Sequence, residues 1–134
     1  MTNFTSTESP LDMFYHWERK KPDAVYLRQP VEQLWREYSW RQVGEEARLM
    51  AAALQALGLR SGQRVSMLSK NCAHWLIADL ATMMSGCSSA PVFTSMSGDD
   101  VRYILDHSDS RLLFVGQTEN WDQVRKVLPD HVTV

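Results

Sequence analysis

The chain has 134 residues, of which 44% are hydrophobic, and carries a formal net charge of -2 with a pI near 6.0. This length suits one domain with its own core, and the weakly acidic balance excludes the electrostatic attraction that nucleic acid or anionic lipid would need. No stretch is apolar for long enough to span a bilayer, and the amino terminus lacks the basic and apolar parts of a signal peptide, so we expect a cytoplasmic protein.

The two cysteines give no sign of a disulfide or a metal site. Cys72 lies at the start of a predicted helix and Cys87 beyond its end, which is too far apart for a bridge. The sequence has no Cys-x-x-Cys motif and no cluster of histidine and cysteine at ligand spacing. We therefore expect buried free thiols in a reducing compartment and predict no metal-binding residue.

The first element of regular structure is predicted after a disordered tail. Residues 1–8 are polar and rich in serine and threonine, with nothing to bury, whereas residues 9–134 have the composition of an α/β subdomain. Ser9 suits the N-cap of a helix and Pro10 suits its first position. We expect this helix to end before Pro22.

A hairpin and a long helix are predicted next. The expected strands are two runs rich in β-branched and aromatic residues, residues 24–28 and 33–38. The turn is expected near Pro30, and the hairpin is expected to form a flap at the edge of the fold. Ser39 and Gln42 have the spacing of a capping box and begin a helix that Gly58 ends. Its apolar stripe comprises Val43, Ala47, Met50, Leu54 and Leu57.

The centre of the chain has the pattern of a βαβ unit. Residues 63–68 form a short apolar strand, and residues 90–93 resume an extended pattern. Between them, Asn71 is expected to cap a helix and Gly86 to end it. The apolar residues of this helix are Ala73, Leu76, Ile77, Leu80, Met83 and Met84. Because the crossover is helical, the two strands are expected to be parallel.

The alternation of strand and helix then repeats. Ser97 precedes the acidic pair Asp99 and Asp100 and is expected to cap a helix whose inward residues are Val101, Ile104 and Leu105. The remaining predicted elements are a strand at residues 111–115, a helix at residues 118–128 and a new strand from residues 132–134. The sequence therefore predicts an α/β fold: a partial doubly wound parallel sheet with helices on both faces, preceded by a helix and a β-hairpin.

No motif with clear chemistry emerges from the sequence. Residues 58–64 contain two glycines, but a phosphate loop would be one residue longer, would have lysine in place of Gln63, and would follow a strand. We favour the interpretation that these residues form a helix cap followed by a turn. The Ser/Thr/Gly-rich residues 85–98 contain no lysine for a phosphate, and we expect a strand end and a loop.

The titratable residues also lack catalytic spacing. The histidines fall on separate elements, without a carboxylate or cysteine at ligand distance: His16, His74, His107 and His131. Asp99 and Asp100 fit the first turn of a helix, which the helix dipole favours. We predict no catalytic residue, no cofactor-binding residue and no metal ligand in this chain.

Several short motifs together resemble one known family, the AMP-forming acyl-CoA synthetases of the adenylate-forming superfamily. The motifs are residues 38–40 (YSW), 58–65 (GLRSGQRV) and 69–72 (SKNC). Four others are most similar to the long-chain fatty-acid branch: residues 77–81 (IADLA), 83–86 (MMSG), 90–92 (APV) and 100–108 (DVRYILDHS). The resemblance covers about residues 10–130 and concerns the amino-terminal part of such enzymes.

The resemblance implies a function for a longer protein. Such a ligase would join a fatty acid to the α-phosphate of Mg-ATP, release pyrophosphate and pass the acyl group to coenzyme A, in the cytoplasm or at a membrane surface. The family's nucleotide loop with its lysine, its Tyr-Gly-x-Thr-Glu element, its ribose-binding aspartate and its carboxy-terminal domain are missing. Where some relatives carry an arginine that meets coenzyme A, this chain has Met96. We therefore expect an inactive fragment that binds no cofactor itself and whose partner is the remainder of the same polypeptide.

Two functional hypotheses follow. The first is the amino-terminal piece of a fatty-acid CoA ligase, and the alternative is a stand-alone α/β binding module that holds a ligand at the carboxyl ends of its strands without catalysis. A truncated sheet would also leave apolar surface and open strand edges exposed, so we expect the isolated fragment to be a homo-oligomer.

Overall fold

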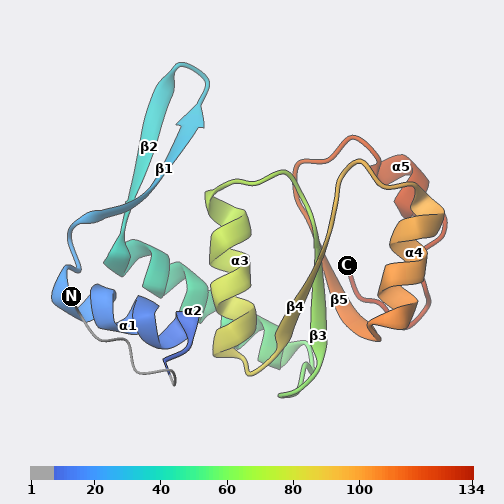
Figure 1. The fold of residues 1–134 in the computed structure, drawn as a ribbon, viewed down its shortest axis with the longest axis horizontal. Helices are drawn as coiled ribbons and strands as arrows, with labels where there is room; N and C mark the ends of the chain where they lie inside the picture. Colours follow the sequence, from blue (N-terminus) through green and yellow to red (C-terminus); the bar gives the residue numbers. More distant parts are fainter. Residues whose placement is uncertain (1–7) are drawn as a thin grey trace.

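The structure is a computed structural model that describes residues 8–134 (Figure 1). In chain order the elements are α1 (Pro10–Lys20), β1 (Val25–Val31), β2 (Leu34–Ser39), α2 (Trp40–Ala56), β3 (Arg64–Leu68), α3 (Ala73–Met84), β4 (Ser88–Val92), α4 (Gly98–His107), β5 (Ser110–Val115) and α5 (Trp121–Val124). Of the predicted disordered tail, only Glu8 lies inside the described residues, where it is exposed and without regular structure.

Three parallel strands form the main sheet, in the order β4-β3-β5. At their carboxyl ends, Leu68 of β3 pairs with Val92 on one side and Val115 on the other. The chain crosses from β3 to β4 through α3 and returns past β3 to β5 through α4. Because right-handed crossovers in opposite directions place their helices on opposite faces, α3 and α4 lie on either side of the sheet (Figure 1). The predicted fold, including the leading helix and hairpin, is confirmed.

Each face of the sheet packs into its own hydrophobic cluster. Val65 and Leu112 contribute to the cluster beneath α2 and α3, and Leu68 and Leu113 to the cluster beneath α4 and α5. Successive side chains of a strand point to opposite faces, so β3 and β5 are buried on both sides. The near-continuous apolar sequences of these strands follow from that double burial.

Both α1 and α2 begin with a capping box, which was predicted for α2, whereas for α1 only the N-cap Ser9 was predicted. The Ser9 and Ser39 hydroxyl groups accept hydrogen bonds from the amides of Asp12 and Gln42, at 3.1 and 3.2 Å. The Asp12 and Gln42 side chains in turn accept from the amides of Ser9 and Ser39. The hydrogen bonds from Ser9 lower the pKa of the exposed Asp12 carboxyl. These local signals fix where both helices begin.

Two leucines from the apolar patterns of the predicted helices are exposed. Leu57 is 62% exposed because α2 ends one residue earlier and Leu57 becomes its C-cap. Leu76 is 39% exposed because it lies at the margin of the inward face of α3, which does include the predicted Ile77 and Leu80. The buried residues of α3 are Ala73, Ile77, Ala78, Leu80, Ala81 and Thr82. This face is rich in small side chains, which lets α2 pack closely against α3.

The hairpin turn lies two residues later than predicted. Pro30 pairs with Trp35 inside the ladder, Val31 pairs with Leu34, and the turn falls at Glu32, whose φ is 55°. A two-stranded hairpin has two open edges, so a proline without an amide proton can sit within β1. The position of Pro30 in the sequence therefore did not indicate the position of the turn.

The predicted N-cap of α3 is also wrong. Cys72, not Asn71, is the N-cap, and its side chain makes no capping hydrogen bond. The amide of Ala73 instead donates to Oε1 of Gln29 in β1, at 2.8 Å. The cap of α3 thus comes from the hairpin, far away in the sequence, and it ties β1 to the first turn of α3.

The last predicted helix is much shorter than expected. The pattern of residues 118–128 predicted a long helix, but α5 contains only Trp121–Val124. Asn120, 8% exposed, precedes it and donates from Nδ2 to the carbonyl of Met96 at 2.8 Å. That bond fastens the loop after β4 to α5. A new strand was predicted at residues 132–134, and there Thr133 forms a single parallel bridge with Leu112 of β5.

Candidate functional site

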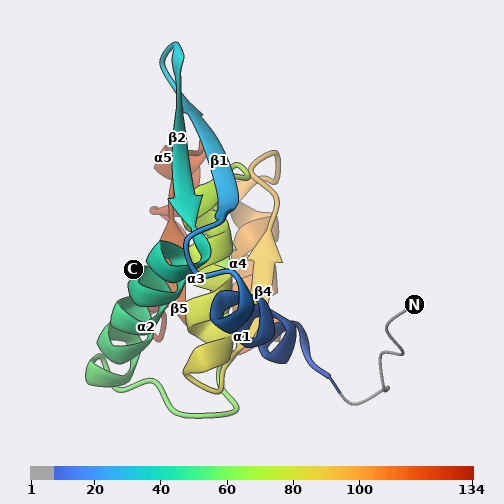
Figure 2. The same cartoon turned by 90° about the vertical axis from the view of Figure 1, so that its left-hand side faces the viewer.

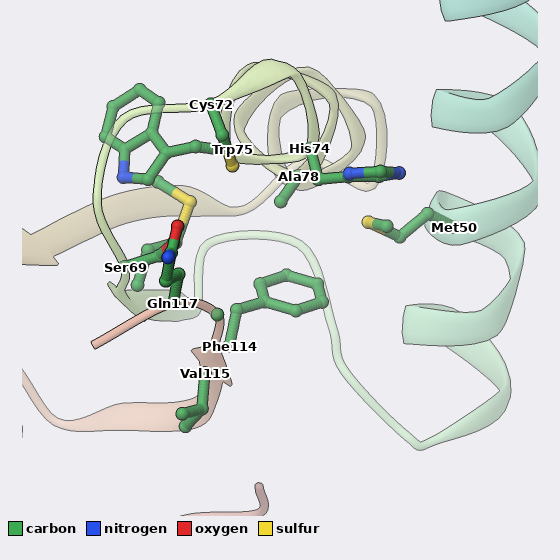
Figure 3. Close-up of a pocket in the computed structure, with 11 residues that line it drawn as sticks. Met50, Ser69, Cys72, His74, Trp75, Ala78, Phe114, Val115 and Gln117 are labelled. Atoms are coloured by element: carbon green, nitrogen blue, oxygen red, sulfur yellow. The ribbon is translucent and has the colours of Figure 1, made fainter. Parts of the chain in front are cut away.

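A pocket of about 380 Å³ lies at the carboxyl ends of β3 and β5 (Figure 3). Its lining residues are Met50, Met67, Ser69, Cys72, His74, Trp75, Ala78, Phe114, Val115, Gly116 and Gln117. In the order β4-β3-β5, the boundary between β3 and β5 is the point where the chain reverses its direction across the sheet. Open α/β sheets bind their ligands at such a switch point. The pocket is therefore the candidate site.

The walls of the pocket come from three elements that are distant in sequence. Met50 projects from α2, His74 and Trp75 belong to the first turn of α3, and Phe114 rises from β5. His74 points toward Met50, while Trp75 lies at the opposite end of the pocket (Figure 3). Mostly apolar walls with few polar groups are suited to an apolar surface or ligand.

The floor of the pocket is held by close contact between the strand ends. Past the ends of β3 and β5, the amide of Gly116 donates to the carbonyl of Leu68 at 3.0 Å, and the amide of Lys70 donates to the carbonyl of Gln117 at 2.8 Å. A Cβ on Gly116 would lie 2.3 Å from Oγ of Ser69. Glycine is needed there because the two strands approach so closely.

An exposed ion pair lies beside the pocket. Nζ of Lys70 is 2.6 Å from Oε1 of Glu119, with 48% and 84% of the side chains exposed. The hydrogen bond from Lys70 lowers the pKa of the Glu119 carboxyl. The solvent around such an exposed pair screens it, so its contribution to stability is small.

Two further pockets adjoin the same edge of the sheet. One, of about 440 Å³, lies between the hairpin and α3 and includes Gln29 and Leu76. The other, of about 360 Å³, lies between the ends of β3 and β4 and includes Lys70 and Phe93. Trp75 contributes to all three pockets. The carboxyl edge is therefore hollowed on both sides of the loop between β3 and α3.

The sequence motifs considered as candidate sites have structural roles: they form turns and helix caps. Gly58 and Gly62 adopt left-handed φ angles of 89° and 86° in the turns between α2 and β3, which confirms the helix cap and turn. Asp100 lies in the first turn of α4, where its amide donates to Oγ of the N-cap Ser97 at 3.2 Å. Asp99 lies in the same turn and is exposed.

The histidines lie apart and contact aromatic rings or solvent. His74 meets Tyr38 edge to face at 6.2 Å between ring centroids, and His107 stacks on Tyr103 at 5.7 Å. Within residues 8–134, no group of three or more His, Cys, Asp or Glu side chains could hold a metal ion. Cys72 and Cys87 are free thiols, the first half-buried and the second buried. That this chain contributes no catalytic, cofactor-binding or metal-binding residue stays a prediction.

The architecture defines a doubly wound α/β unit with an apolar pocket at its switch point. Residues 14–134 match the family described as AMP-binding enzyme, and the chain belongs to that family. The long-chain-fatty-acid–CoA ligase FadD15 of Mycobacterium tuberculosis is 28% identical over 102 residues, covering 76% of this chain and 17% of FadD15. The chain thus spans less than a fifth of that relative's length.

A shorter relative and a solved structure complete the comparison. The uncharacterized protein Rv1549 of Mycobacterium tuberculosis is 29% identical over 127 residues, covering 92% of this chain and 71% of that protein. The anthranilate CoA ligase AuaEII, solved with anthranoyl-AMP, superposes with a TM-score of 0.81 at 24% identity, over 98% of this chain and 25% of that one. The superposition on AuaEII confirms the fold. In the part of the chain that the structure describes, no helix is both long and apolar enough to cross a membrane.

Proposed function

We propose that this chain is the amino-terminal structural segment of a long-chain fatty-acid CoA ligase. In the complete enzyme a fatty acid would attack the α-phosphate of Mg-ATP, displace pyrophosphate and form an acyl-adenylate, from which the acyl group passes to coenzyme A. The observation that carries the proposal is the family match over residues 14–134, together with a long-chain ligase among the relatives. We place the enzyme in the cytoplasm or at a membrane surface.

In this proposal the segment supplies support and not chemistry. Its three-stranded sheet and tightly joined strand ends give a rigid base, and the loops at the carboxyl edge form walls for a site completed by other parts of the polypeptide. ATP, Mg and coenzyme A are substrates of that complete site. The segment itself lacks a phosphate loop with its lysine, since Gln63 stands at the corresponding position.

The isolated chain is expected neither to bind Mg-ATP tightly nor to form acyl-adenylate from palmitate. Pyrophosphate release and calorimetric titration with Mg-ATP measure the two activities directly. Stoichiometric binding with a dissociation constant in the low micromolar range would contradict the purely structural role. Release of pyrophosphate that depends on both palmitate and the chain would do the same.

A second candidate, which the comparisons do not favour, is a stand-alone α/β binding module. The pocket has the position and apolar lining of a ligand site, and Rv1549 is a relative of modest length. The coding sequence downstream of Val134 separates the candidates. An open frame that continues into a Ser/Thr/Gly loop with lysine supports the ligase, and a stop codon supports the module.

We also propose that the isolated chain associates with itself. Within residues 8–134, the outer edge of β5 carries only the single bridge to Thr133, and Leu34, Trp35 and Phe93 are each more than 60% exposed. Open edges and exposed apolar side chains favour self-association. Light scattering coupled to size-exclusion chromatography is expected to show a dimer or larger species. A single 15.4 kDa species persisting at tens of micromolar would exclude it.

A further inference from the structure

The hairpin ends in an apolar tip that the rest of the described chain does not cover. We define the hairpin tip as Val31, Leu34 and Trp35, which are 49%, 78% and 67% exposed. Figures 1 and 2, which view the molecule from two perpendicular directions, both show the hairpin rising past the carboxyl ends of the main sheet. Phe93, 74% exposed just after β4, lies at that same edge.

The base of the hairpin is anchored, whereas the tip is not. Tyr38, near the base, is 3% exposed and belongs to the core, and Gln29 still reaches α3 through its hydrogen bond to Ala73. Beyond Gln29, the neighbouring residues Leu34 and Trp35 are both mainly exposed. Adjacent residues of a strand point to opposite faces, so both faces of the tip are bare. An isolated two-stranded hairpin is only marginally stable in water, and packing against a further element stabilises it.

The charges of the hairpin suit a protein partner. Arg28 pairs with Glu37 at 3.0 Å, and the guanidinium of Arg36 lies 4.8 Å from the ring centroid of Tyr38. Both arginines are thus engaged within the hairpin and offer little attraction to a polyanion. Glu32, at the turn, would have to enter a bilayer before the tip did, which is costly for a carboxylate. An apolar centre bordered by paired charges is the composition of a protein interface.

The comparison with relatives indicates what the protein partner of the hairpin tip is. The matched residues make up 17% of FadD15, and in AuaEII the same fold forms 25% of a longer chain. In both ligases most of the polypeptide therefore lies outside this segment. Resting on the function proposed above, we propose that the hairpin tip and Phe93 form the docking face for the remainder of the ligase fold, which closes over the carboxyl edge and its pockets.

The test is a chimera in which residues 1–134 replace the matched residues of FadD15. Hydroxyl-radical footprinting with mass spectrometry compares the chimera with the isolated chain, at a dilution where light scattering shows a monomer. Leu34, Trp35 and Phe93 are expected to react about fivefold more slowly in the chimera, because interface centres lose their water. Leu49 and Tyr103, 74% and 67% exposed on α2 and α4, are matched controls and should react equally in both.

A pair of variants gives a second measurement. At a dilution where the isolated chain is monomeric, the double substitution Leu34→Glu and Trp35→Glu is expected to leave its melting unchanged but to lower the melting temperature of the chimera. Leu49→Glu with Tyr103→Glu should lower neither. Equal reactivity of the tip in both contexts, a chimera indifferent to the tip variant, or a wild-type chimera that does not fold would each overturn the docking face.

The outcome for the proposed function is read separately, from acyl-CoA formation by the chimera. A protected tip without acyl-CoA formation leaves the docking face standing and removes the ligase function. An active chimera with an unprotected tip removes the docking face and leaves the ligase function standing.

Discussion

Replacing Leu80 by aspartate is expected to abolish soluble, cooperatively folded protein. Leu80 is 7% exposed on α3 and belongs to the cluster that joins α1, α2 and α3 to the sheet. Burying an unpaired carboxylate and losing the leucine side chain together cost about 5 kcal/mol or more. A domain's whole stability is about 5–15 kcal/mol, so the loss is comparable to the total.

Two further substitutions separate charge burial from other effects. Leu80→Ala keeps the site apolar and is expected to melt cooperatively with a loss of about 2–5 kcal/mol. Leu49→Asp places the same carboxylate on α2 at a residue that is 74% exposed and should melt close to wild type. Circular dichroism and urea denaturation measure all three. A Leu80→Asp protein with near wild-type stability would show that this face of α3 does not support the fold.

The elements that the sequence predicted correctly are those with local signals. Ser9, Ser39 and Ser97 were each predicted as N-caps, and each hydroxyl group accepts from an amide three residues later. Such bonds depend on residues within one turn, so their pattern is readable in the chain. The Gly86 prediction has the same basis, since its φ of 75° ends α3.

The predictions that failed depended on contacts between distant residues. Asn71 has the chemistry of a cap, but Gln29 supplies the bond to α3 because the hairpin brings it there. Leu76 fits the helical period of the buried stripe, yet which face of α3 turns inward is decided by α2 and the sheet. Periodicity identifies a helix more reliably than it identifies the neighbours that the helix packs against.

The candidate site was predictable in position but not in composition. The rule that α/β sheets bind ligands at carboxyl ends, stated with the binding-module hypothesis, matches the location of the pocket. Its walls combine Met50, His74 and Phe114, which no sequence motif links. One usable signal was Gly116 directly after an apolar strand, since a glycine there indicates close backbone approach.

Gly86→Ala is expected to destabilise the protein more than Gly58→Ala, although both glycines have the same kind of backbone. Their φ angles are 75° and 89°, a region that costs an alanine about 1–2 kcal/mol. Around Gly58 a new Cβ would meet nothing within 4 Å, whereas at Gly86 it would lie 2.6 Å from Oγ and 3.1 Å from Cβ of Ser61. The turn that carries Ser61 must therefore move away.

That movement has a structural consequence, because the amide of Gly62 donates to the carbonyl of Gly86 at 2.8 Å where the chain enters β3 and β4. Overpacking of this kind adds about 1–3 kcal/mol, so we expect a total loss of about 2–5 kcal/mol for Gly86→Ala. Gly58→Ala should lose only the backbone cost. Urea denaturation measures the free energy of unfolding of both variants. If the dependence of that free energy on urea concentration is unchanged, the difference between the two losses gives the steric contribution. Equal losses would mean that Ser61 yields without cost, and that Gly86 is needed for its φ angle alone.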